Sequence, residues 1–186
     1  MPARADAAAG TERLGRSEPP GGYEWLIALL EGAGARYRII EHAPEGRTEV
    51  VSGYRGHPAA QAAKCVVAMV KVGKHDRRYF LAVVPGDRRV DLQALRVLAS
   101  GKCVIFASRE EAEALAGSRS GSILPFSARS DLELVVDPGV LKQAVMFFNA
   151  ARLDRSLALD VGDYVRIAQP RIHPIAATQT EEHHDR

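Results

Sequence analysis

The chain has 186 residues, of which 46% are hydrophobic and 26% charged, and it carries 25 Lys and Arg against 23 Asp and Glu. This composition is typical of a folded globular protein and argues against a collagen-like, coiled-coil or wholly disordered chain, while the length suits one domain. The longest uninterrupted apolar runs have six residues, whereas a transmembrane helix needs roughly 20. We therefore expect a soluble, cytoplasmic protein that does not enter a membrane.

The nearly neutral total hides an uneven distribution of charge. Residues 36–89 carry 11 basic and 5 acidic side chains, a net charge of +6, whereas residues 1–35 and 90–186 each have a net charge of −2. A basic segment can be an ordinary solvated surface, or it can attract a polyanion such as a nucleic-acid backbone. Charge alone leaves both interpretations open.

The two ends of the chain differ in composition from the rest. Residues 1–22 mix Ala, Gly, Pro and balanced charges, with Leu14 as the one large apolar side chain after Met1, so they cannot bury enough surface to offset their ordering entropy. Residues 177–186 are mostly polar. The sequence predicts a disordered leader, a folded domain over residues 23–176 and a polar tail.

Within the folded part, the apolar pattern predicts alternating helices and strands. Apolar residues recur at helical spacing over residues 23–31, and glycines then provide a stop. Asp91 and Ser108 precede two further helical stretches and are expected to cap them. Residues 161–167 fit either a helix or a strand. In chain order we expect a helix at 23–31, a strand at 36–41, a short helix at 58–63, strands at 64–71 and 77–84, helices at 92–99 and 109–115, and strands at 123–126, 132–136, 144–148 and 156–159.

The connections between these strands indicate the type of sheet. The segment GKHD between the strands at 64–71 and 77–84 has the composition of a hairpin turn. Other neighbouring strands are also joined by segments too short for the crossover helix that parallel neighbours need. The sequence therefore predicts a single α/β domain with a mixed, largely antiparallel sheet rather than a doubly wound parallel one.

Common cofactor and catalytic motifs are missing from the sequence. It contains no GxxxxGK[ST] phosphate loop, GxGxxG, HExxH, CxxC or GxSxG segment. The histidines before the tail are scattered rather than spaced as metal ligands, so we expect neither a zinc enzyme nor a nucleotide-cofactor enzyme of the common motif types. Cys65 and Cys103 both lie in apolar runs, which predicts buried free thiols.

Three features remain as candidates for a functional site. Lys64 stands between PAAQAA and the apolar run CVVAMV, and a lysine at the start of a buried strand must snorkel, pair or bind an anion. Gly121 and Pro125 shape the segment GSILPF, which either presents backbone groups to a ligand or forms a simple turn. Asn149 follows the apolar run AVMFF and is either a pocket residue or a turn residue.

Taken in order, these features resemble the YbaK/ProX family of aminoacyl-tRNA deacylases, which is related to the editing domain of bacterial prolyl-tRNA synthetases. The resemblance runs from about residue 23 to residue 175. The matching positions are Glu41-His42-x-Pro44 followed by Thr48, Ala62-Ala63-Lys64 at the start of a strand, residues 79–85 followed by Asp91-Leu92, Gly121-Ser122-Ile123-x-Pro125-Phe126, Val135-Val136-Asp137, and Asn149.

The resemblance implies a compact domain whose curved mixed sheet encloses a pocket for an aminoacyl group. It implies a trans-editing hydrolase that cleaves the ester bond of a mischarged or unusual aminoacyl-tRNA, without a cofactor and with an aminoacyl-tRNA synthetase as a possible partner. Lys64 would hold the tRNA 3′ end, while the backbone of Gly121, Ser122 and Ile123 would position the substrate carbonyl or the attacking water. The implied substrate-binding residues are His42, Thr48, Pro125, Phe126, Asp137 and Asn149.

This chemistry does not require a nucleophilic side chain. An aminoacyl ester is already activated, so an enzyme gains much by positioning water and stabilising the developing oxyanion. Ser127 and Ala151 stand where glycine is common in the family, which leaves open a non-catalytic tRNA-binding or regulatory module of the same fold. An accessory enzyme of specialised metabolism is a third reading. Candidate contacts for the RNA backbone, each otherwise a solvated side chain, are Arg77, Arg78, Arg88 and Arg89.

Overall fold

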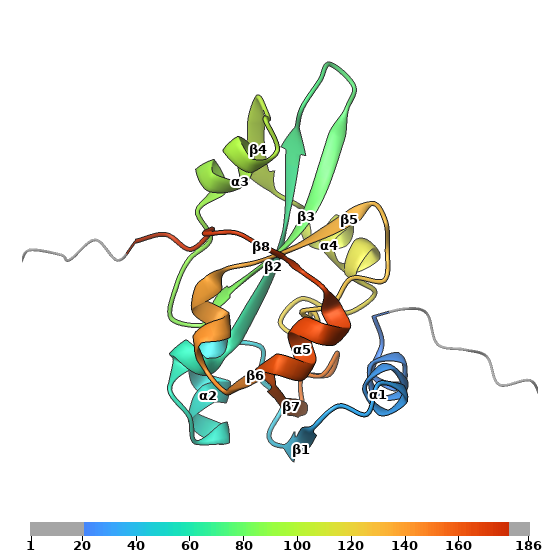
Figure 1. Cartoon of the computed structure of the whole chain (residues 1–186), viewed down its shortest axis with the longest axis vertical. Helices are drawn as coiled ribbons and strands as arrows, with labels where there is room; N and C mark the ends of the chain where they lie inside the picture. The colour runs from blue at the N-terminus through green and yellow to red at the C-terminus, as the bar shows by residue number, and fades with distance from the viewer. Residues whose placement is uncertain (1–20, 179–186) are drawn as a thin grey trace, which may run out of the picture.

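Two β-sheets organise residues 21–178, the part of the chain that the computed structural model describes (Figure 1). The predicted leader and tail lie almost entirely outside this range, so both stay predictions. The larger sheet has the strand order β4-β2-β3-β5-β8, and the smaller sheet has the order β1-β7-β6. The strands are β1 (Tyr37–Glu41), β2 (Ala63–Lys71), β3 (Arg77–Pro85), β4 (Cys103–Phe106), β5 (Leu132–Val136), β6 (Val145–Asn149), β7 (Arg155–Asp160) and β8 (Arg171–Ile172).

The strand pairing is mixed. Four pairings are antiparallel, while β3 with β5 and β5 with β8 are parallel. This confirms the predicted mixed, largely antiparallel α/β fold, with its strands divided between two sheets. An isolated parallel bridge between Ala62 and Phe147 joins the segment before β2 to β6. The two sheets therefore meet at the N-terminal end of β2.

The helices begin largely where the sequence places their caps. Asp91 accepts hydrogen bonds from two backbone N–H groups of the helix that follows it, and Ser108 forms a capping box, both as predicted. Asp160 caps the segment that was ambiguous in the sequence, and this segment is a helix. The predicted helix at 58–63 is only a 3₁₀ turn. The helices are α1 (Tyr23–Gly32), α2 (Thr48–Arg55), α3 (Leu92–Leu98), α4 (Arg109–Ala116) and α5 (Val161–Ala168), with 3₁₀ turns η1 (Ala59–Gln61) and η2 (Pro138–Lys142).

Two predictions of local structure were wrong. Residues 123–126 form an irregular buried segment rather than a strand, because Pro125 has no N–H to give to a ladder and its carbonyl accepts from the Tyr164 hydroxyl at 2.8 Å. Cys103 is exposed rather than buried, because β4 is an edge strand of the larger sheet. Helix α2 and the short strands β4 and β8 were not predicted.

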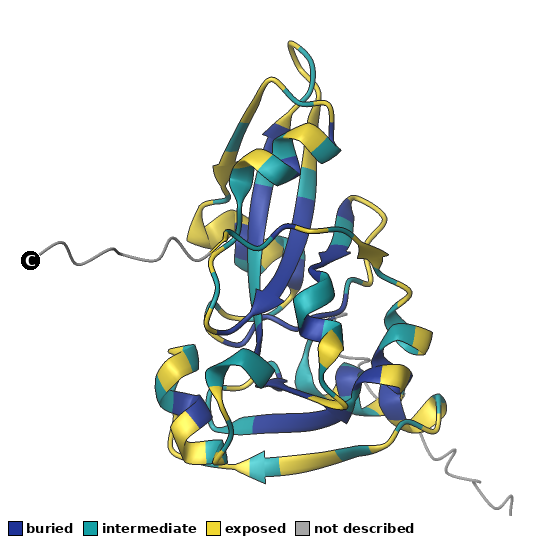
Figure 2. Cartoon of the chain, turned by 60° about the vertical axis from the view of Figure 1, so that its left-hand side comes forward, coloured by how far each residue is buried: buried dark blue, intermediate teal, exposed yellow. Residues whose placement is uncertain are grey.

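Both faces of the larger sheet are buried, so the molecule has two hydrophobic clusters. Alternate residues of β2 and β3 point to opposite faces. Val67 and Leu81 lie in the cluster formed with α1, α4, α5 and the smaller sheet, whereas Val70 and Phe80 pack with Leu95 of α3. Figure 2 shows this burial along the two long central strands and the exposed tip of their hairpin. The larger sheet is thus packed on both of its faces, and the N-terminal end of β2, where the smaller sheet begins, belongs to this packed structure.

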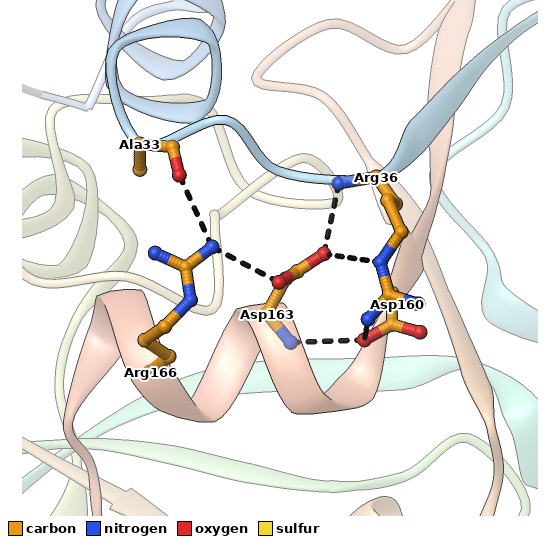
Figure 3. A network of polar contacts seen from close by, with 5 residues as sticks. All are labelled: Ala33, Arg36, Asp160, Asp163 and Arg166. Atoms are coloured by element: carbon orange, nitrogen blue, oxygen red, sulfur yellow. Dashed lines mark hydrogen bonds and ion pairs between the residues drawn. The ribbon is translucent and has the colours of Figure 1, made fainter.

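A network around Asp163 fixes α5 to the segment that follows α1 (Figure 3). The Asp163 carboxylate accepts from the backbone N–H of Arg36 at 2.9 Å, from its Nε at 3.0 Å, and from Nη2 of Arg166 at 2.9 Å. Arg166 also donates to the carbonyl of Ala33, and Arg36 pairs with Asp160 at 2.8 Å. The pKa of Asp163 is lowered to about 2, first by the Arg36 backbone N–H and then by the two arginine side chains.

This network predicts how stability depends on pH. Because the pKa of Asp163 is lower in the folded chain (about 2) than its ordinary value of 3.8, its contribution is complete above the ordinary value and is lost as the pH falls toward 2. The melting temperature of the wild-type chain should therefore fall more steeply with acid than that of Asp163→Asn, which should melt lower at neutral pH. Thermal unfolding followed by circular dichroism from neutral pH to about pH 2 measures this; parallel curves would contradict it.

Candidate active site

A cavity of about 320 Å³ lies where the N-terminal end of β2 meets α2, β6 and the loop at residue 121. Five of the residues that the sequence singled out line it: Thr48, Lys64, Gly121, Ile123 and Asn149. The other lining residues are Gly46, Arg47, Glu49, Val51, Arg55, Ala62, Ala63, Cys65 and Phe148.

Asn149, the last residue of β6, joins the two loops that border the cavity. Its Nδ2 donates to the carbonyls of Glu45 and Gly121, both at 2.8 Å. Its Oδ1 accepts from Nη2 of Arg55 at 2.6 Å and from the hydroxyl of Ser156 at 2.9 Å. The side chain is buried, and all of these bonds are made within the chain, so Asn149 positions backbone groups around the cavity.

Ser156, the cross-strand partner of Asn149 in β7, extends this network to His42. Its buried hydroxyl accepts from Nε of Arg55 at 2.8 Å and lies 2.6 Å from Nε2 of His42. Nδ1 of His42 lies 2.8 Å from the carbonyl of Ala43. His42 is thus not a lining residue of the cavity, and within residues 21–178 its hydrogen bonds connect it to Asn149 through Ser156.

The two loops also touch through their backbones. Gly121 has φ +87°, a conformation that favours glycine, and a Cβ there would lie 2.9 Å from Cα of Gly46. A Cβ on Gly46 would in turn lie 3.3 Å from Cα of Gly121. This close approach gives the cavity an edge made of backbone groups.

The cavity carries an excess of positive charge. Nζ of Lys64 donates to the carbonyl of Arg88 at 2.9 Å, and neither Lys64 nor Arg55 belongs to any ion pair found within residues 21–178. Burial lowers the pKa of Arg55 to about 10, which leaves it protonated at neutral pH. Arg47 is neutralised by Glu45 at 2.8 Å. Two lining cations without a carboxylate partner favour an anionic ligand.

Cys65 lines the same cavity but is a poor candidate for a nucleophile. Burial raises the pKa of its thiol, and the thiolate is the reactive form of cysteine. Among residues 21–178, no three His, Cys, Asp or Glu side chains gather as they would around a metal ion. The cavity therefore offers positive charge and hydrogen bonds.

The remaining sequence-predicted site residues in the 121–126 segment do not line the cavity. The buried hydroxyl of Ser122 donates to the carbonyl of Arg119 at 3.0 Å. The Pro125 carbonyl accepts a hydrogen bond from the Tyr164 hydroxyl. Phe126 packs edge-on against the rings of Phe148 and Tyr164, with centroids 6.2 and 5.2 Å away. These contacts attach the 121–126 segment to the rest of the domain.

Asp137 also lies away from the cavity. Its buried carboxylate accepts from the backbone N–H groups of Gly139, Ile175 and Ala176 at 2.7 to 2.9 Å. Asp137 thus attaches the C-terminal segment to the end of β5.

The two departures from the family pattern leave the local backbone intact. Ala151 has φ +57°, so it adopts the left-handed conformation that a glycine would adopt there. The Ser127 hydroxyl donates to the carbonyl of Leu132 at 2.7 Å and accepts from the N–H of Arg129. Neither residue lines the cavity.

A sequence profile of the aminoacyl-tRNA editing domain matches residues 42–167, which include every residue lining the cavity. The chain belongs to the aminoacyl-tRNA editing domain family. This confirms the family predicted from the sequence and the coarse prediction of an aminoacyl-tRNA editing hydrolase. No helix of this editing domain, over the residues that the structure describes, is long and apolar enough to cross a membrane.

Known proteins resemble this editing domain in sequence and in fold. The multifunctional Ser/Thr-tRNA deacylase ProXp-y of Escherichia coli K12 is 38% identical over 151 residues, which are 81% of this chain and 90% of that protein. A crystal structure assigned to trans-editing for prolyl tRNA synthetase has a TM-score of 0.69 at 19% identity and covers 87% of this chain and 100% of its own. The crystal structure of a hypothetical protein has a TM-score of 0.73 at 18% identity and covers 82% of this chain and 99% of its own. At these identities the two structures support the fold alone.

Sequence reasoning missed Arg55, Glu45 and Ser156. Asn149 and Ser156 end and begin two apolar runs separated by a short polar turn, and this hairpin pattern could have paired them. Arg55 lies in a helix that the pattern did not reveal, and nothing in its neighbourhood in the sequence links it to residues about 100 positions away.

Proposed function

We propose that the chain hydrolyses the ester bond between an amino acid and the 3′ end of a tRNA, with the aminoacyl group held in the cavity between α2 and β6. The observation that carries this proposal is the lining of the cavity in a member of the editing family. Backbone groups held by Asn149 form one side of it, and Lys64 and Arg55 contribute positive charge without carboxylate partners.

The lining suggests a role for each group. Lys64 attracts the phosphate of the terminal nucleotide, and the basic segment around it attracts the rest of the RNA. The N–H groups of Gly121 and Ile123 make no hydrogen bond within residues 21–178, so they are candidate donors to the substrate carbonyl. Arg55 uses Nε and Nη2 within the network, and its other N–H donors are available for the oxyanion.

In this mechanism the protein positions water and contributes no covalent intermediate. A water molecule adds to the ester carbonyl, the developing oxyanion is held by the donors of the 121–123 loop, and the carbon–oxygen bond to the ribose then breaks. The proton given up by the water passes to the departing ribose oxygen, with the adjacent ribose hydroxyl as a natural relay. The products are the free amino acid and an uncharged tRNA.

The first substrates to examine are tRNAs charged with serine or threonine. A protein 38% identical to this chain is a Ser/Thr-tRNA deacylase, and a cavity of about 320 Å³ suits a small aminoacyl group with its ribose. The prediction that a synthetase is a partner has no further support.

A panel of aminoacyl-tRNAs tests the proposal. The purified full-length chain is expected to release amino acid from seryl- or threonyl-tRNA at least about tenfold faster than from alanyl-, cysteinyl- and prolyl-tRNA, the discrimination that a few atoms of side chain provide. Release is followed by acid precipitation of labelled aminoacyl-tRNA, with uncatalysed hydrolysis as the control. Tight, salt-dependent binding of tRNA without release from any charged tRNA would instead support the non-catalytic module.

A further inference from the structure

A second cavity, of about 420 Å³, lies beside the first. Its lining comes from the end of β3 and the turn after it, from η2 and from the C-terminal segment, and it includes Pro85, Arg88, Pro138, Lys142 and Pro174. It shares no lining residue with the first cavity, and the proposed hydrolysis leaves it without a role.

Lys64 connects the linings of the two cavities. Lys64 lines the first cavity, and its ammonium donates to the backbone carbonyl of Arg88, which lines the second, at 2.9 Å. The 3₁₀ turn η1 separates them, since Ala60 faces the second cavity and Ala62 the first. The linings of the two cavities are therefore connected through Lys64 and through η1.

The chemistry of the second cavity suits a nucleotide. Neither Arg88 nor Lys142 belongs to an ion pair within residues 21–178, so both are available for a phosphate. A base can stack on an arginine guanidinium, and the proline rings add flat apolar surface. The Asp137 carboxylate already accepts from three backbone N–H groups, whereas the exposed Asp87 can accept from the amino group of a cytosine.

We infer that the second cavity binds the nucleotide that precedes the terminal adenosine of the substrate. This inference rests on the proposed function, because it takes the first cavity to hold the aminoacyl group and the ribose of the terminal adenosine. The single-stranded end of tRNA, cytidine-cytidine-adenosine, then runs from Arg88 past Lys64 to the loop at Gly121. Binding of this nucleotide fixes the ester bond relative to the backbone donors.

Substrates of graded length test the inference. The wild-type chain is expected to hydrolyse a seryl trinucleotide ending in CCA with a kcat/KM roughly tenfold above that for seryl-adenosine, the gain that stacking one base typically provides. In Arg88→Ala/Lys142→Ala this preference should disappear, with seryl-adenosine changed by less than about twofold. Arg88→Ala removes only the side chain, so the carbonyl that holds Lys64 stays in place.

The matched control is Arg38→Ala/Lys71→Ala, which removes two exposed positive charges from β1 and from the far end of β2 and should keep the wild-type preference. An unchanged preference in Arg88→Ala/Lys142→Ala, or an equal loss on both substrates, would overturn the inference. Binding of the uncharged trinucleotide gives a readout that does not depend on hydrolysis: the same double variant should weaken it about tenfold and leave adenosine binding unchanged. If no substrate is hydrolysed, the proposed function fails, and the binding result alone decides on the second cavity.

Discussion

Lys64→Ala is expected to lower kcat/KM for aminoacyl-tRNA hydrolysis by about 100-fold, the effect of removing one well-placed donor to an anion. The Lys64 ammonium has a backbone carbonyl as its partner and no carboxylate within residues 21–178, so its charge is free to attract a phosphate. Because that attraction is present before and during the reaction, most of the loss should be a rise in KM.

Two variants separate this role from a structural one. Lys64→Met keeps most of the side-chain volume and should lose activity as Lys64→Ala does, while melting close to the wild type. Lys71→Ala removes an exposed lysine from the other end of the same strand and should change kcat/KM less than about threefold, since an exposed charge away from the site acts only through screened long-range attraction. Steady-state kinetics at two salt concentrations measure all three variants. Full activity in Lys64→Met would refute the assigned role.

The sequence could predict the position of Lys64 because its signal is local. A lysine at the start of a long apolar strand must keep its ammonium in a polar environment. The structure places Lys64 at the N-terminal end of β2, where the two sheets meet. The string GSILPF carried less information. Gly121 and Ile123 line the cavity, whereas Ser122 between them is buried and does not line it. A motif in the sequence identifies the segment and not which of its residues face the ligand.

The position of Arg55 could not be predicted because its causes are distant in the sequence. Helix α2 contains Gly53 and adjacent valines at 50 and 51, all with low helix propensity, so its pattern did not predict a helix. What fixes Arg55 is hydrogen bonding to Asn149 and Ser156, which lie 94 and 101 residues further along the chain. The division of the strands into two sheets could not be predicted for the same reason, since it depends on pairing between strands that are distant in the sequence.

Asn149→Ala is expected to reduce both stability and catalysis. The substitution leaves the carbonyls of Glu45 and Gly121 without their buried donor and removes the acceptor of Nη2 of Arg55. Losing these bonds should lower the free energy of unfolding by roughly 3 kcal/mol. Because the Gly121 loop is then no longer held, kcat should fall by about 100-fold at a temperature where the variant is folded. Urea unfolding and single-turnover hydrolysis measure the two effects.

Asn149→Asp tests whether catalysis depends on the hydrogen bonds from Asn149 to the two loops or on its hydrogen bond with Arg55. An aspartate keeps an oxygen toward Arg55 and Ser156, but it places its second oxygen against the two carbonyls that Nδ2 now donates to. If Asn149 acts by holding the loops, Asn149→Asp should lose kcat as Asn149→Ala does, even though its charge pairs with Arg55. Asp163→Asn provides the control, because it weakens a network on α5 outside the cavity and should lower the melting temperature while leaving kcat unchanged. Activity retained in Asn149→Asp would mean that the acceptor for Arg55, and not the hold on Gly121, is what the reaction requires.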